Sequence, residues 1–163
     1  MKNTILLLLI LVGVLVFAVG YSDSKYRTAI GRHVPSMNLS SPYGDICVGD
    51  AGGDYILLNF WKSTDAPSRK RANDYTAWLR RHENAGLRFV SVNMDESPEM
   101  YREIVRRDSL IPSTQYHVGG DTARAIYNSF GLEYGLGTML VNPEGKIIAH
   151  NPSWDELNKL TAQ

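Results

Sequence analysis

The sequence predicts an α/β fold in which helices flank a central mixed β-sheet. Residues Tyr55–Trp61 form a short and almost wholly apolar run that begins just after glycine, as in a strand buried on both faces. Strand-like and helix-like segments then alternate. Two further apolar runs, Thr138–Val141 and Lys146–Ala149, flank the turn sequence N-P-E-G and predict a hairpin. Alternation gives parallel strands and a hairpin adds an antiparallel pair, so the sheet should be mixed.

The remaining elements follow from start and stop signals. Ser63 to Pro67 is a helix start, and the helix that follows should end at Gly86. Turn residues 41–45 separate two short strands. The other predicted elements are a strand at Leu87–Asn93, a helix from about Pro98 to Arg107, a strand at Gln115–Val118, a helix at Asp121–Phe130 and a closing helix at Trp154–Leu160.

Composition excludes several classes of function. The chain has 163 residues, with 17 Lys+Arg against 17 Asp+Glu, and so lacks the basic excess of a nucleic-acid-binding protein. Its one cysteine, Cys47, cannot form an internal disulfide or a CxxC pair. The four histidines are scattered without metal-ligand spacing. We therefore expect one domain with no metal, no cofactor and no nucleic-acid partner.

The N-terminus has a different character. Residues 5–19 are an unbroken run without charged side chains, of a length between that of a signal-peptide core and that of a membrane span. Residues 1–20 are therefore predicted to be a hydrophobic helix, acting as a signal peptide cleaved after Gly20 or as a transmembrane anchor. Residues 21–30 read as a polar tether, and 31–163 as the domain. Both alternatives place the domain in the cell envelope, on the periplasmic or extracytoplasmic side, either attached to the membrane or secreted.

Three segments of the domain resemble one family. Residues 57–70 read L-L-N-F-W-K-S-T-D-A-P-S-R-K, 134–147 read Y-G-L-G-T-M-L-V-N-P-E-G-K-I, and 31–39 read G-R-H-V-P-S-M-N-L. In order and spacing they are similar to the active strand and helix, the later proline loop and the first segment of TlpA/ResA-type thiol-disulfide oxidoreductases. This resemblance, within the AhpC/TSA-like group, implies a thioredoxin-like fold from about Gly31 to Leu160.

The same resemblance implies that the redox chemistry is missing. Asp65 and Ser68 stand where the family has its two cysteines, and Leu136 stands at its cis-proline. A carboxylate cannot attack a disulfide, and a serine hydroxyl is too weakly acidic to replace a thiolate. A non-proline residue should restore a trans peptide bond. The resemblance thus implies a redox-inactive binding or scaffold module, which could hold an envelope protein or peptide in a groove beside Trp61, Asp65, Ser68, Leu136 and Gly137.

Other interpretations of these residues stay open. Asp65 suits a helix cap and Ser68 an ordinary first-turn residue, while Trp61 suits the core as well as a groove. Cys47 suits a buried inert thiol, but a thiol-disulfide oxidoreductase that uses Cys47 with a partner's cysteine is an alternative. A peroxidase-like or hydrolytic enzyme using Asp65 is a third reading.

The basic clusters at 69–71, 80–81 and 106–107 suit a solvated helix face, or contact with anionic lipid. On the first reading, replacing Arg69 by alanine should cost under about 0.5 kcal/mol.

Overall fold

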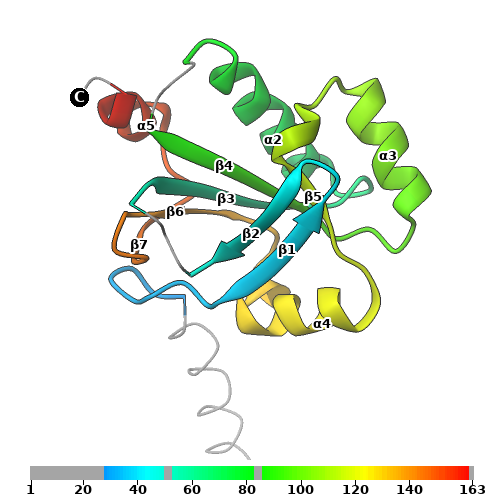
Figure 1. Cartoon of the computed structure of the whole chain (residues 1–163), viewed down its shortest axis with the longest axis horizontal. Coiled ribbons are helices and arrows are strands. Elements are labelled where there is room, and N and C mark those ends of the chain that lie inside the picture. Colours follow the sequence, from blue (N-terminus) through cyan, green and yellow to red (C-terminus); the bar gives the residue numbers. More distant parts are fainter. Residues whose placement is uncertain (1–27, 50–52, 83–85, 162–163) are drawn as a thin grey trace, which may run out of the picture.

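A computed structural model of the chain describes residues 28–49, 53–82 and 86–161 (Figure 1). Its main sheet has five strands in the order β5-β4-β3-β6-β7, and a separate two-stranded hairpin pairs β1 with β2. The strands are β1 Met37–Ser41, β2 Gly44–Val48, β3 Tyr55–Trp61, β4 Leu87–Asn93, β5 Gln115–His117, β6 Thr138–Val141 and β7 Ile147–His150. The helices are α2 Ala66–Leu79, α3 Pro98–Arg107, α4 Gly120–Ser129 and α5 Trp154–Thr161, with short 3-10 turns η1 Pro112–Thr114 and η2 Leu132–Tyr134.

The sheet is mixed, as the sequence predicts. Strand β3 lies at its centre and runs parallel to β4, with Tyr55 opposite Leu87 and Trp61 opposite Asn93. On its other side β3 runs antiparallel to β6, which in turn pairs antiparallel with β7. Strand β5 extends the parallel half beyond β4. Because β3 and β4 are parallel, both end at the same edge of the sheet, and the loops that follow them meet there.

Two layers cover the sheet. Leu58 and Phe60 of β3 face one layer, where they pack against the β1–β2 hairpin and α4. Leu57 faces the other side and packs in a second cluster with side chains of α2 and α5. Trp61 at the end of β3 belongs to a third cluster, shared with α2 and α3. Figure 1 shows the hairpin crossing in front of the sheet and α2 on its far side.

Helix α2 ends earlier than the sequence suggested. It stops at Leu79, not at Gly86, which lies seven residues further on and has a φ of 61°. The ring of His82 stacks on Trp78 with centroids 4.3 Å apart, and its Nδ1 lies 2.9 Å from the carbonyl oxygen of Trp78. The backbone tightens at this end of the helix, where the Arg81 and His82 N–H groups donate to the Trp78 and Leu79 carbonyls three positions back, at 3.0 Å each.

The predicted hydrophobic helix at 1–20, and most of the tether at 21–30, lie outside the described residues. Within the described residues, no helix combines the length and apolar character that crossing a bilayer requires.

Candidate functional site

The first turn of α2 holds Asp65 and Ser68, the two positions that the sequence resemblance likened to a redox cysteine pair. Asp65 is the N-cap of the helix, and its carboxylate accepts a hydrogen bond from the Ser68 backbone N–H at 2.8 Å. The Ser68 hydroxyl donates to the Asp65 carbonyl at 3.1 Å and accepts from the Lys62 N–H at 3.2 Å. Ser68 is fully buried. As predicted, Asp65 caps the helix and Ser68 is a first-turn residue.

The charge of Asp65 is fixed by these contacts. Hydrogen bonds from Ser68 lower the pKa of the Asp65 carboxyl below its usual value of 3.8, and the nearby Arg71 and Lys62 lower it further. Asp65 is therefore ionised at neutral pH, and its negative charge lies at the positive end of the helix dipole. A carboxylate held in this way is a poor general base, because its conjugate acid is strong.

Arg71 joins α2 to the loop before β6. Its guanidinium donates a hydrogen bond to the backbone carbonyl of Leu136, 65 positions away in the chain. The next carbonyl, that of Gly137, accepts from the Phe60 N–H at 3.0 Å. No peptide bond among the described residues is cis, so the bond before Leu136 is trans, as expected. The structure thus brings Asp65, Ser68 and Leu136 into one neighbourhood through Arg71.

This contact corrects the prediction of a solvated basic face at residues 69–71. Arg69 forms a bidentate pair with Asp108, with both N–O distances at 2.6 Å. Arg71 is turned inward to Leu136, and only Lys70 is an exposed ion-pair partner, to Asp74. The three residues succeed one another at 100° on the helix, so they point in different directions.

A buried carboxylate lies beside this turn, and sequence reasoning missed it. Asp95, 5% exposed, follows β4 and accepts from the Ser63 N–H at 2.9 Å, from the Ser63 hydroxyl and from the Asn93 amide at 2.8 Å. The Asp95 carbonyl accepts from His117 Nε2 at 2.9 Å. The available signal was the pair of polar residues at the end of a buried strand, Asn93 as its last residue and Asp95 two positions on. The network fixes the loop that leads from β3 into α2.

Comparison with known proteins now places the chain. The sequence pattern of the AhpC/TSA family matches residues 30–150, which is most of the described domain. The chain belongs to the AhpC/TSA family.

Related proteins agree with this placement. The chain is 25% identical over 142 residues to thiol-disulfide oxidoreductase ResA of Bacillus subtilis (strain 168), covering 83% of this chain and 77% of ResA. A crystal structure of a thioredoxin-like protein from Parabacteroides distasonis ATCC 8503 superposes with a TM-score of 0.72 at 29% identity, over 83% of this chain and 96% of that one. A thiol:disulfide interchange protein from Bacteroides sp. shares the fold with a TM-score of 0.70 at 22% identity, over 83% and 90% of the two chains. The domain therefore has a thioredoxin-like fold.

Within this family fold, Trp61 belongs to the core rather than to a groove. Its side chain is fully buried and packs against Ala72 and Ile104, with the Tyr101 ring 6.4 Å away. Of the two readings of Trp61 that the sequence left open, the structure agrees with the core, because α3 covers the ring; the position of α3 could not be read from the local sequence.

Cys47 lies far from the α2 turn in this AhpC/TSA-family domain. Its neighbours in β2, Ile46 and Val48, point into the cluster between the hairpin and the sheet, so Cys47 points away from the sheet. It is half-buried rather than buried, and its sulfur lies 3.8 Å from the Ser36 hydroxyl. The hairpin and α2 cover opposite faces, which separates this thiol from the helix N-terminus.

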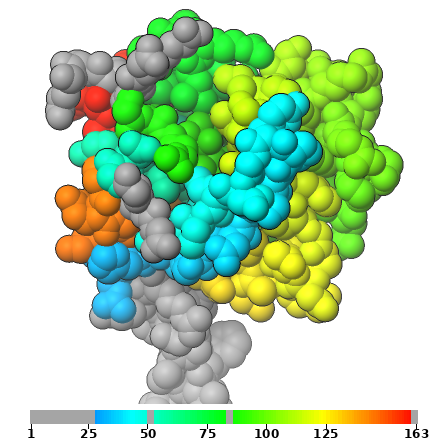
Figure 2. Space-filling model, viewed as in Figure 1, coloured from blue at the N-terminus to red at the C-terminus, as the bar shows by residue number. Residues whose placement is uncertain are grey.

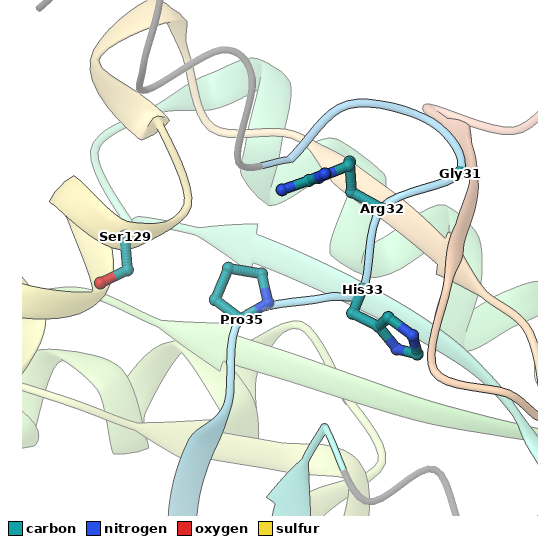
Figure 3. Close-up of a pocket in the computed structure, with 5 residues that line it drawn as sticks. All are labelled: Gly31, Arg32, His33, Pro35 and Ser129. Atoms are coloured by element: carbon teal, nitrogen blue, oxygen red, sulfur yellow. The ribbon is translucent and has the colours of Figure 1, made fainter.

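Gly137, the last of the predicted groove residues, lines a hollow to which Asp65, Ser68 and Leu136 do not contribute. This hollow has a volume of about 330 Å³ and lies between η2, β6 and residues 28–30. Another hollow of about 510 Å³ separates residues 31–35 from the end of α4. In Figure 3, Ser129 lies across this gap from Pro35 and Arg32, with its hydroxyl turned away from both. The Ser129 hydroxyl already donates to the Ala125 carbonyl, so it is not poised as a nucleophile. Among the described residues, no three His, Cys, Asp or Glu side chains are grouped to hold a metal.

Proposed function

We propose that this chain is a redox-inactive thioredoxin-like module that works by binding an envelope protein or peptide. The observation that carries the proposal is the closed α2 turn. A redox CxxC needs an accessible thiolate at this helix end and a second thiol to resolve the mixed disulfide. Here Asp65 and Ser68 occupy the aligned positions, and they are hydrogen-bonded to each other and to Lys62.

The position of the one thiol supports the proposal. Cys47 points outward from the hairpin on the face of the sheet opposite α2. It therefore lacks the helix dipole and free amides that stabilise a catalytic thiolate. The alternative, an oxidoreductase that pairs Cys47 with a partner's cysteine, would have to work without that activation.

We expect a bound peptide also to contact the backbone of the Leu136 loop. Its carbonyl would be available to pair with an extended peptide, but Arg71 already donates to it. A peptide that pairs with this backbone must first displace Arg71. We therefore expect that Arg71→Gln exposes the carbonyl and tightens binding of extended peptides at this loop.

A disulfide-reductase assay tests the absence of catalysis. Insulin reduction by dithiothreitol is measured with the chain from Tyr21 onward. Wild type should match the blank without protein. Asp65→Cys with Ser68→Cys should gain some rate, and adding Leu136→Pro should gain more. Activity in wild type that disappears in Cys47→Ser would overturn the proposal in favour of the Cys47 alternative.

Export is a separate part of the proposal, supported by the apolar run at 5–19. Cells that express the full chain with a C-terminal reporter are fractionated. A full-length band in membranes indicates an anchor, and a band about 20 residues shorter outside the cytosol indicates cleavage. A reporter found only in the cytosol would contradict export.

A further inference from the structure

A third hollow lies between the hairpin tip and the segment that carries α3, η1 and β5, and no residue of the first turn of α2 lines it. Its volume is about 620 Å³, which is within the range of small-molecule sites. Pro42 and Tyr43 form one wall from the tip of the hairpin, and Tyr101 and Val105 of α3 form the other. Figure 2 shows the cyan hairpin reaching the lime-coloured part of the surface that holds α3.

Three rings, those of Tyr43, Tyr101 and His117, line this cleft. The rings of Tyr101 and His117 stack with centroids 5.1 Å apart, and Tyr43 is 65% exposed at the mouth. Burial, with a smaller contribution from Tyr43, raises the pKa of Tyr101 to about 12, so its phenol stays neutral. Flat, uncharged ring surfaces of this kind favour a planar apolar ligand, which can stack against them.

One buried polar group in the lining is unsatisfied. Gln115 is 1% exposed, and its amide nitrogen donates to the Thr114 hydroxyl at 2.9 Å. Its carbonyl oxygen Oε1 has no hydrogen-bond partner within the described part of the chain. Gln115 and His117 are two residues apart in β5, so both side chains lie on the cleft side of the strand. A buried acceptor without a donor is costly, and a ligand that brings a donor recovers that cost.

The charged residues that line the cleft are all basic. They are Arg80, Arg102 and Arg106. Arg102 and Arg106 are partly neutralised by ion pairs to Glu99 and Glu103 on α3, at 2.9 and 2.8 Å. Arg80 is held over the cleft by a hydrogen bond to the Ser109 carbonyl, an uncharged group. Its charge is therefore available to an anion.

We propose that this cleft binds a planar aromatic carboxylate that carries a hydrogen-bond donor on its ring system. The ring system stacks between Tyr43 and the Tyr101–His117 pair, the donor reaches Gln115 Oε1, and the carboxylate pairs with Arg80. No residue of the first turn of α2 lines this cleft, so ligand binding here is tested separately from the absence of redox chemistry.

Three matched probes separate the contributions. They are 6-hydroxy-2-naphthoate, 2-naphthoate without the donor, and 2-naphthol without the carboxylate. Binding is measured by equilibrium dialysis on the full chain in phospholipid nanodiscs, with empty nanodiscs subtracted. The hydroxy acid should bind with 1:1 stoichiometry at concentrations below roughly 1 mM, and each matched probe should bind about three- to tenfold more weakly.

Two variants assign the contacts. Gln115→Leu should bring the hydroxy acid down to the affinity of 2-naphthoate and leave 2-naphthoate within about twofold, which general damage to the site would not do. Arg80→Gln, at an exposed position, should weaken both acids about three- to tenfold and leave 2-naphthol unchanged. Lys70→Gln, exposed on α2 and away from the cleft, is the control.

The outcomes decide the proposal. No binding above empty nanodiscs, equal affinity for all three probes, or wild-type affinity in Arg80→Gln would each overturn it. Thermal unfolding followed by circular dichroism checks that both variants are folded. If Gln115→Leu does not fold, Arg80→Gln and the probe series still decide.

Discussion

The ion pair between Arg69 and Asp108 should contribute much more to stability than the sequence alone suggests. Arg69 donates from Nε and from a terminal nitrogen to the two carboxylate oxygens of Asp108, and Asn73 adds a third hydrogen bond at 3.2 Å. The Asp108 side chain is 11% exposed and that of Arg69 is 26% exposed. Arg69→Ala leaves this largely buried carboxylate with two weaker partners, the Asn73 amide at 3.2 Å and the Arg107 guanidinium at 3.8 Å. Because the site is not fully buried, the expected loss is about 1 to 3 kcal/mol, below the range for a buried pair.

Urea melts of the chain from Tyr21 onward measure this loss. The matched control is Lys70→Ala, the next residue, whose pair with Asp74 is largely solvent-exposed and worth less than about 0.5 kcal/mol. The loss should also depend on pH. Hydrogen bonding from Arg69, with help from Asn73, lowers the Asp108 pKa below 3.8, so this stability is present above pH 3.8 and disappears as the pH falls through the lower value.

Two results would refute this reasoning. Equal losses in Arg69→Ala and Lys70→Ala would show that the bidentate geometry adds nothing to stability. A difference between wild type and Arg69→Ala that persists unchanged in acid, after Asp108 is protonated, would show that the loss comes from packing of the arginine stem rather than from the ion pair.

Three further predictions test the core, the helix end and the free thiol. Phe60→Ala should cost about 2 to 5 kcal/mol in urea melts, whereas Ile148→Ala, which is 38% exposed, should cost under about 1 kcal/mol. In a Cys47→Ser background, Asp65→Cys should give a thiol with a pKa of about 5.5 to 7.5 from the pH dependence of alkylation, and adding Arg71→Gln should raise it; an ordinary pKa near 8.5 would contradict the helix-end argument. Cys47→Ser alone should change stability by under about 0.5 kcal/mol, and a larger loss would mean that the thiol packs as core.

The parts of the fold that local patterns determine were predictable. Strands β3, β4 and β6 have the bounds that their apolar runs indicated, because a buried strand shows its limits in consecutive residues. The end of α2 was predicted too late, because the helix closes with backbone hydrogen bonds to residues three positions back, where no glycine or proline marks the sequence, and Gly86 follows only seven residues after Leu79.

In the candidate site, likewise, contacts between residues close in sequence were predictable and contacts between distant residues were not. The Asp65 cap joins residues three positions apart and follows from an acidic residue before Ala-Pro. The contacts of Arg71 with Leu136 and of Arg69 with Asp108 span 65 and 39 positions, so periodicity indicated only that both residues lie on a helix. The burial of Trp61 likewise depends on where α3 packs.

The electrostatics of the α2 turn explain how a thioredoxin-like fold can form without a cysteine pair at this helix end. A thiolate and a carboxylate both place negative charge at the positive end of a helix dipole, but they differ in how accessible the charged atom must remain. A catalytic thiolate must stay accessible, whereas Asp65 is tied to the Ser68 N–H and lies near Arg71. Restoring cysteines at 65 and 68 removes this cap and the Ser68 hydroxyl bonds together. Any regained reductase activity should therefore come with lost stability, so the closed turn and an active thiol pair are alternatives at this helix end.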